Sequence, residues 1–265
     1  MTGVREQLFP AGTFTPAPRP SSVPRMLSAQ YGLELKLLLR NGEQLLLTMF
    51  IPVTLLVGLS LLPLGDFPEP RVAVFVPAIM ALAVISTAFT GQAIAVAFDR
   101  RYGALKRLGA TALPVWAIIA GKVLAVVSVV SLQALLLGGI GLALGWRPPP
   151  AGLALGALLI GLGTAVFVAM GLLLGGTLRA EIVLAVANLL WFVLAGFGAL
   201  TLESNTIAPA LSWAARLTPS GALTEALSHA VSPSGMVSVD WFGIAVLAVW
   251  GALSTLGALR WFRFT

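Results

Sequence analysis

The sequence contains no cysteine, one histidine and few charged side chains. The lack of cysteine excludes disulfides, thiolate metal sites and cysteine nucleophiles. Asp, Glu, Lys and Arg make up 10% of the 265 residues, whereas soluble domains carry about 25%. The single histidine, His229, has no base or oxyanion group at a spacing that would build a hydrolase site. The sequence therefore argues against a soluble globule and provides no recognisable catalytic centre.

Six long apolar runs dominate what is present. Apolar residues make up 58% of the chain, and the mean hydropathy is +0.97. A helix that crosses the hydrocarbon core of a bilayer needs about 20 mainly apolar residues. Runs of about that length or more cover residues 44–62, 73–98, 115–144, 151–178, 182–202 and 241–259. We therefore predict an all-α polytopic membrane protein with six transmembrane helices, in which residues 44–265 form one transmembrane domain.

The 16 Lys and Arg residues are distributed unequally around these runs. Only Arg71, Arg147 and Arg216 lie on one side of the predicted membrane, and the others lie on the opposite side. Short loops rich in Lys and Arg stay in the cytoplasm, so both termini are predicted to be cytoplasmic in a cell inner (plasma) membrane. The net charge of +6 then reflects orientation and contact with anionic membrane lipid. Basic and aromatic residues do not interleave in a way that indicates nucleic-acid binding.

The region before the first apolar run has two parts. Residues 1–24 are rich in proline and lack an apolar stretch, which predicts a flexible cytoplasmic tail and not a signal peptide. Residues 25–43 are amphipathic, because Lys36, Arg40 and Glu43 lie opposite a helical face formed by Leu27, Tyr31, Leu35 and Leu38. We predict a helix that lies in the headgroup region. The alternative is a cytoplasmic extension of the first transmembrane helix.

Residues 99–114, here called the basic loop, join the second and third apolar runs and carry four basic residues and one acid. Leu105 and Leu108 are three residues apart, so a short helix would present them on one face, with Lys106 and Arg107 pointing elsewhere. An apolar knob ringed by positive charge suits docking onto another protein. The alternative is an anchor that only follows the preference for positive charge on the cytoplasmic side.

The basic loop and the residues after it resemble a known sequence pattern. The matching residues are Arg101-Tyr102-Gly103-Ala104-Leu105-Lys106-Arg107-Leu108, then Thr111, Pro114, Trp116 and Gly121-Lys122. They are similar to the cytoplasmic loop and following helix of type-2 ABC-exporter permeases. The resemblance extends to the tail, the interfacial helix, the six transmembrane helices and a long outer segment. The family pattern commonly has Thr and Glu where this chain has Ala104 and Lys106.

This resemblance implies a partner that supplies the energy. In the family the loop is a coupling helix that sits in a cleft of an ATPase subunit. By position, the contact candidates are Arg101, Gly103, Leu105, Arg107 and Leu108. The chain has no Gly-X-X-X-X-Gly-Lys-Ser/Thr phosphate loop, so ATP and Mg are expected in the ATPase. Two ATPase copies would bind a pair of permeases, identical or paralogous, and no cofactor, metal site or enzymatic activity is expected in this chain.

Polar side chains within the second and fifth apolar runs are candidates for a transport pathway, because in the resembled family these two helices line the path. The candidates are Ser86, Thr87, Thr90, Gln92, Asn188 and Trp191. The alternative is that they only form hydrogen bonds between packed helices. Lys122, near the cytoplasmic end of the third run, is expected to extend its amine to the membrane interface.

Glycines also recur four residues apart, as Gly141 with Gly145, Gly152 with Gly156, and Gly171 with Gly175. This spacing permits close approach between helices without identifying the helix that approaches.

The outer segment, residues 203–240, is long enough to contain two short helices, near residues 207–217 and 221–231. Thr218 is predicted to cap the second helix and Pro219 to occupy its first position. Few charges interrupt these helices, so they are expected to dip into the outer leaflet as re-entrant helices. The resemblance implies an exit gate, and the alternative is an interfacial lid.

The resemblance implies the permease half of an ATP-driven exporter of a hydrophobic or amphipathic cargo such as a drug, an antibiotic or a lipid. Polysaccharide exporters share this layout and stay an alternative. Two other classes also stay open: an integral-membrane enzyme acting on lipids, and a non-transporting membrane subunit for assembly or sensing. Such an enzyme would need an acid or histidine cluster at a membrane interface, and the sequence shows none.

Overall fold

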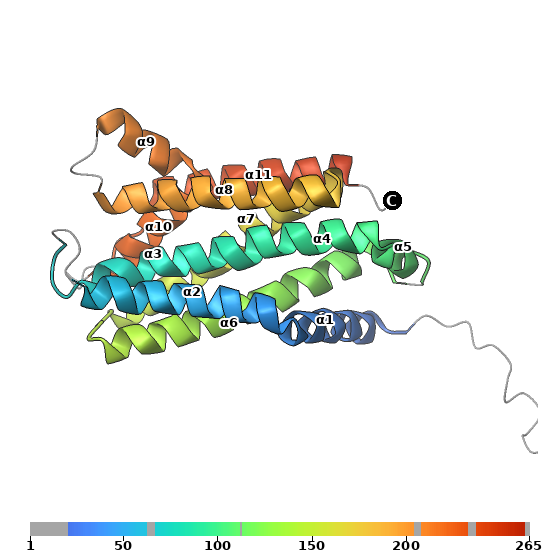
Figure 1. Ribbon diagram of the computed structural model, residues 1–265, viewed down its shortest axis with the longest axis horizontal. Coiled ribbons are helices and arrows are strands. Elements are labelled where there is room, and N and C mark those ends of the chain that lie inside the picture. The colour runs from blue at the N-terminus through green and yellow to red at the C-terminus, as the bar shows by residue number, and fades with distance from the viewer. Residues whose placement is uncertain (1–20, 63–66, 112, 204–207, 233–236, 263–265) are drawn as a thin grey trace, which may run out of the picture.

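The computed structural model describes residues 21–62, 67–111, 113–203, 208–232 and 237–262, and its regular elements in these ranges are all helices (Figure 1). They are α1 (Val23–Arg40), α2 (Gly42–Leu61), α3 (Val72–Val84), the π-helix η1 (Ile85–Gly91), α4 (Gln92–Arg101), α5 (Ala104–Gly109), α6 (Val115–Ala143), α7 (Pro150–Thr177), α8 (Ala180–Leu200), the 3₁₀-helix η2 (Thr201–Glu203), α9 (Pro209–Leu217), α10 (Pro219–Ala230) and α11 (Trp241–Trp261). The predicted all-α fold is confirmed. Most of the predicted tail, residues 1–20, lies outside the described residues.

The predicted transmembrane runs all form helices. Five helical segments are long and apolar enough to cross a membrane: Val72–Arg101, Trp116–Ala143, Pro150–Thr177, Ala180–Leu200 and Trp241–Trp261. The first of these joins α3, η1 and α4 into one continuous helix. A sixth crossing would come from the pair α1 and α2, whose axes are bent by 65°. The chain is therefore a multi-pass membrane protein.

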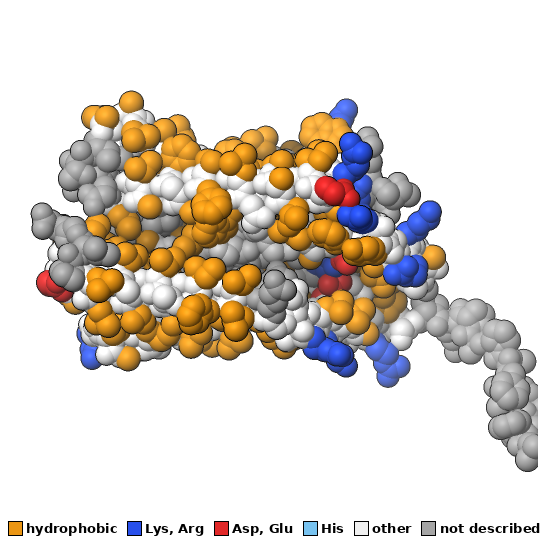
Figure 2. All heavy atoms as spheres, viewed as in Figure 1, with side chains coloured by type: hydrophobic (Ala, Val, Ile, Leu, Met, Phe, Trp, Pro, Cys, Tyr) orange, Lys and Arg blue, Asp and Glu red, His pale blue; other side chains and the backbone are white. Residues whose placement is uncertain are grey.

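Charged and apolar side chains are separated along the bundle. Figure 2 shows apolar side chains along the flank of the molecule and most of the Lys and Arg side chains at the end where α4 leads into α5. We call this end the basic end. The prediction that the basic end faces the cytoplasm stays a prediction.

Helix α1 packs along α6 at the basic end. Its predicted apolar stripe is half-buried and includes Tyr31, whose hydroxyl lies 2.9 Å from the Ser128 hydroxyl of α6. Gln30 and Glu34 lie on the same side and are buried. The helix is thus amphipathic in an unexpected way, with polar groups inside the face that contacts the protein. Its predicted location in the headgroups stays a prediction.

The glycine pairs on α7 mark two close helix contacts. A Cβ atom at Gly171 would lie 2.8 Å from the Phe89 carbonyl oxygen of η1, and one at Gly175 would meet the Ala93 carbonyl oxygen of α4. At the other end of α7, a Cβ atom at Gly152 would meet the Ala230 carbonyl oxygen of α10. Glycine therefore lets α7 approach the backbone of its neighbours at both ends.

The outer segment forms the two predicted helices, α9 and α10. The Thr218 hydroxyl accepts a hydrogen bond from the Gly221 amide at 3.1 Å, and Pro219 is the first residue of α10. Both the cap and the proline position are therefore confirmed. However, α10 is not a lid on the surface, because most of its residues are buried against α3, α7, α8 and α11. Its small residues, including Ala222 and Ala226, permit this close packing.

Candidate functional site

Two adjoining hollows lie between α2, the α3–η1–α4 helix and α8. The near hollow, which is closer to the basic end, has a volume of about 660 Å³, and its lining includes Asn41 and Phe192. The far hollow has a volume of about 700 Å³, and its lining includes Leu55 and Thr224. Leu82, Trp191 and Phe192 line both hollows, so the two form a single groove. We call this feature the groove.

The polarity of the groove changes along its length. The near hollow is lined by the polar side chains of Asn41, Thr48, Ser86, Thr90, Asn188 and Trp191 as well as by apolar ones. The far hollow is lined almost wholly by apolar side chains, with Thr224 as an exception. Among the described residues that line either hollow, none carries a charge. The groove therefore matches a molecule with an uncharged polar part and an apolar part.

The π-helix η1 supplies one wall of the near hollow. Ser86 and Thr90 both lie in this segment and both face the hollow. The Ser86 hydroxyl donates to the Leu82 carbonyl oxygen at 2.9 Å and accepts from the Trp191 indole N–H of α8 at 2.7 Å. The Thr90 hydroxyl is buried and has no hydrogen-bond partner among the described residues. Single-turn π segments within α-helices are often found at functional sites.

The structure places four of the six pathway candidates in the groove and two elsewhere. Four of them, Ser86, Thr90, Asn188 and Trp191, line the near hollow together. Thr87 points into the protein, where its hydroxyl donates to the Gln133 side-chain oxygen at 3.0 Å. Thr87 therefore fits the alternative of helix packing. The role of the other four in transport stays a prediction.

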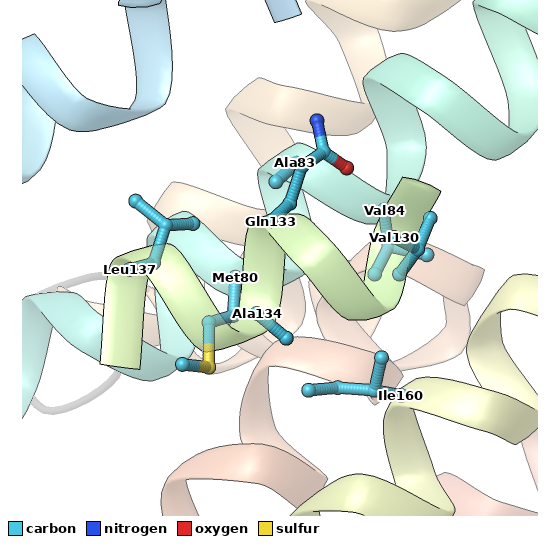
Figure 3. A pocket seen from close by; sticks show the side chains of 8 residues that line it. All are labelled: Met80, Ala83, Val84, Val130, Gln133, Ala134, Leu137 and Ile160. Atoms are coloured by element: carbon cyan, nitrogen blue, oxygen red, sulfur yellow. The ribbon is translucent and has the colours of Figure 1, made fainter. Parts of the chain in front are cut away.

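Gln133 of α6 explains why Thr87 turns inward. Figure 3 shows Gln133 beside the apolar side chains of Met80, Ala134 and Ile160, with its amide directed away from them. That amide accepts from Thr87 and donates to the Thr48 carbonyl oxygen of α2 at 2.9 Å. A buried amide must be hydrogen-bonded, so Gln133 holds η1 and α2 against α6.

The sixth candidate, Gln92, lies beside a buried cluster of charges. Lys122 of α6 is 5% exposed, and its Nζ lies 2.9 Å from Glu34 Oε2 of α1 and 2.7 Å from Asp99 Oδ2 of α4. We call these three residues the Lys122 cluster. Gln30 donates to the other Glu34 oxygen at 2.8 Å. Gln92, Glu34, Asp99 and Lys122 line a small cavity of about 120 Å³.

The predicted exposure of Lys122 at the membrane interface is therefore wrong. Its amine pairs with two carboxylates because α1 packs against α6 and brings Glu34 to it. Sequence reasoning also missed Glu34. A signal existed, since Gln30 and Glu34 fall on the same helical face as Leu27, Tyr31 and Leu38. A glutamate inside an otherwise apolar stripe indicates a buried partner.

The basic loop contains the short helix α5. Gly103 precedes this helix with φ of +68°, in the left-handed region that favours glycine. Leu105 is 2% exposed and packs into the core, and Leu108 is half-buried against the same core. The predicted apolar knob on the surface is thus wrong for Leu105, which instead anchors α5. The exposed side chains of the loop include Tyr102, Lys106 and Arg107.

Two arginines attach the start of the basic loop to the rest of the bundle. Arg100 Nη1 donates to the carbonyl oxygens of Gly175 at 2.9 Å and Leu178 at 3.1 Å, at the end of α7. Arg101 forms an ion pair with Glu181 at the start of α8. Arg107 donates to the Tyr102 carbonyl oxygen within the loop at 3.1 Å. The arginines therefore bind groups of this chain, whatever else contacts them.

Comparison with known proteins identifies the family of the chain. A family model described as ABC-2 type transporter matches residues 31–231. The matched range includes α2 to α10, the groove and the basic loop. A search of curated proteins gave no match.

Proposed function

The chain belongs to the ABC-2 type transporter family and is a permease subunit of an ABC transporter, and we propose that it exports an amphipathic cargo with energy from a separate ATPase. In this proposal two permeases, identical or paralogous, form the pathway and two ATPase copies bind ATP and Mg. The basic end, with both termini, lies on the cytoplasmic side of the inner (plasma) membrane. This side holds the basic loop that the family resemblance assigns to the ATPase.

The observation that carries the proposal is the groove. It lies between α2, η1 and α8 and combines a hydrogen-bonding near hollow with an apolar far hollow. An amphiphile could leave bulk lipid and enter such a groove without exposing its apolar part to water. A polysaccharide has many hydroxyls to satisfy, and the far hollow offers few polar groups for them. The groove therefore favours a drug, antibiotic or lipid over a polysaccharide.

The docking surface in this proposal differs from the one that the sequence indicates. Because Leu105 is buried, it supports α5 from inside and does not contact the ATPase. Gly103 permits the turn into α5, and Leu108 packs partly against the core. The exposed side chains of the basic loop, chiefly Tyr102, Lys106 and Arg107, contact the ATPase directly in this proposal. The positive charge of Lys106 and Arg107 suits an acidic cleft on the partner.

The test separates docking from transport. The chain is purified with the ATPase that accompanies it in native membranes and reconstituted in vesicles. ATP-dependent movement is then measured for fluorescent amphiphiles that are neutral, cationic or anionic. We expect Trp191→Ala to reduce transport while the ATPase stays bound, because this change removes a groove wall and the bond to Ser86. We expect Lys106→Glu with Arg107→Glu to release the ATPase.

A matched control makes the outcome decisive. Trp213→Ala removes a side chain of the same kind on α9, where it is exposed and outside the lining of the groove, and should leave both properties unchanged. A chain that carries no ATPase, or that moves none of the amphiphiles when ATP is supplied, would contradict the proposal. Equal losses of transport in the Trp191 and Trp213 variants would contradict the assignment of the groove as the transport pathway.

A further inference from the structure

Three consecutive residues at the start of the basic loop bind three different helices. Asp99 pairs with Lys122 of α6. Arg100 donates to carbonyl oxygens at the end of α7. Arg101 pairs with Glu181 of α8. A displacement of the basic loop therefore acts on all three helices at once.

The connections to α6 and α8 differ in strength. In the Lys122 cluster, Lys122 and Glu34 of α1 are buried and Asp99 is half-buried, so α6, α4 and α1 are joined firmly. The Arg101 and Glu181 side chains are 49% and 62% exposed, and such an exposed pair contributes little to stability. Helix α8 is also the least buried of the five spanning segments. Apart from this pair, α8 contacts α4 through the packing of Ala180, Val183 and Ala187 against Ala93 and Ala97, so the polar connection to α8 can rearrange while the connection to α6 stays fixed.

Helix α8 carries the movement to the groove. Glu181 is its second residue, and Asn188 and Trp191 of the groove follow on the same uninterrupted helix. At 1.5 Å per residue, Asn188 lies about 10 Å and Trp191 about 15 Å along the helix from Glu181. Because α8 is continuous, a displacement of Glu181 moves Asn188 and Trp191 with it, and these residues form part of the groove wall.

Resting on the proposed function, we propose that Arg101 is a positioning residue whose ion pair with Glu181 transmits movement of the basic loop to the α8 wall of the groove. The Lys122 cluster holds the opposite side of the loop and acts as the pivot. Arg101 therefore acts within this chain, and its contribution to ATPase binding is secondary. The proposal requires opposite charges at positions 101 and 181. It does not require that the positive charge be the one at position 101.

The experiment follows the groove directly and needs no cargo. Because the chain has no cysteine, Leu184→Cys introduces a single thiol on α8 that is partly exposed and lines the near hollow. Its rate of modification by a maleimide is measured in the permease–ATPase complex without nucleotide and with ATP and vanadate. The same measurement is made with Arg101→Glu, with Glu181→Arg and with both changes together. Bound ATPase and the melting temperature are recorded for each variant.

We expect each single charge reversal to abolish the nucleotide-dependent change in rate while the ATPase stays bound and the melting temperature is unchanged. The double reversal restores the pair and should restore the change. Arg179→Glu is the matched control, because it reverses an exposed charge two residues from Glu181. It should leave the nucleotide-dependent change intact.

Three results would overturn the proposal. The single variants could keep the nucleotide-dependent change, the double variant could fail to regain it, or Arg101→Glu could release the ATPase. The last result would make Arg101 a partner contact and would agree with the proposed function. The proposed function itself would fail in a different way, since the unaltered chain would then bind no ATPase.

Discussion

The two ends of the helical bundle each hold one cation between two carboxylates. At the basic end, Lys122 pairs with Glu34 and Asp99 at 2.9 and 2.7 Å. At the other end, Arg216 of α9 lies 2.6 Å from Glu225 of α10 and 3.8 Å from Asp240, the residue before α11. We call the second group the Arg216 cluster. The two clusters carry the same charges, but they differ in the identity and burial of the cation and in the sequence separation of their members.

The Lys122 cluster joins helices that are distant in sequence, whereas the Arg216 cluster joins consecutive ones. The Lys122 side chain is 6% exposed, and that of Arg216 is 27% exposed. Arg216 also lies over the rings of Trp213 and Phe242, at 5.3 and 5.1 Å from their centroids. Thr218 alone separates α9 from α10, and residues 231–240 lead from α10 to α11. The Lys122 cluster therefore determines tertiary arrangement, and the Arg216 cluster refines an arrangement that chain connectivity provides.

The largest difference is expected when each cation is removed. In Lys122→Met, the Glu34 carboxylate stays buried without a cation, and the half-buried Asp99 carboxylate stays near it. We expect the free energy of unfolding in detergent to fall by about 3–5 kcal/mol, the usual cost of breaking a buried ion pair. Adding Glu34→Gln should recover part of the loss. Lys106→Met, at an exposed site, is the control, and an equal loss there would contradict this account of the Lys122 cluster.

The glycine contacts test whether packing also differs between the ends. Gly175→Ala would push a Cβ atom against the Ala93 carbonyl oxygen, and Gly152→Ala would do so against the Ala230 carbonyl oxygen. Each change should lower the free energy of unfolding by about 1–3 kcal/mol, because the clash is with backbone. Gly161→Ala on the same helix meets no atom within 4 Å and should be nearly neutral. If the two variants lose similar free energies of unfolding, helix packing is equally tight at both ends, and the ends differ only in their charged clusters. If the losses are unequal, packing also differs between the ends.

The sequence predicts the features that depend on length and composition alone. The spanning helices follow from apolar runs, and the cap at Thr218 follows from local turn chemistry. It does not predict features that depend on which helix lies opposite. Lys122 has its partners 88 and 23 positions away, so a local pattern can indicate that Glu34 has a buried partner but cannot identify Lys122 as that partner. For the same reason the sequence could not show that Leu105 faces inward, or that Thr87 bonds to Gln133 while Ser86 lines the groove.

The smallest effect is expected at the Arg216 cluster. In Arg216→Met, Asp240 keeps the hydrogen bond that it accepts from the Gly243 amide at 3.1 Å, and the methionine still covers the rings of Trp213 and Phe242. The Glu225 side chain is 22% exposed, so water can replace part of its lost partner. We therefore expect a loss of about 1 kcal/mol. Glu225→Gln should produce a similar loss, and the double variant should lose little more, because both changes remove one interaction. A loss as large as that of Lys122→Met would mean that connectivity does not hold α9 to α11 together, and the contrast between the two ends would disappear.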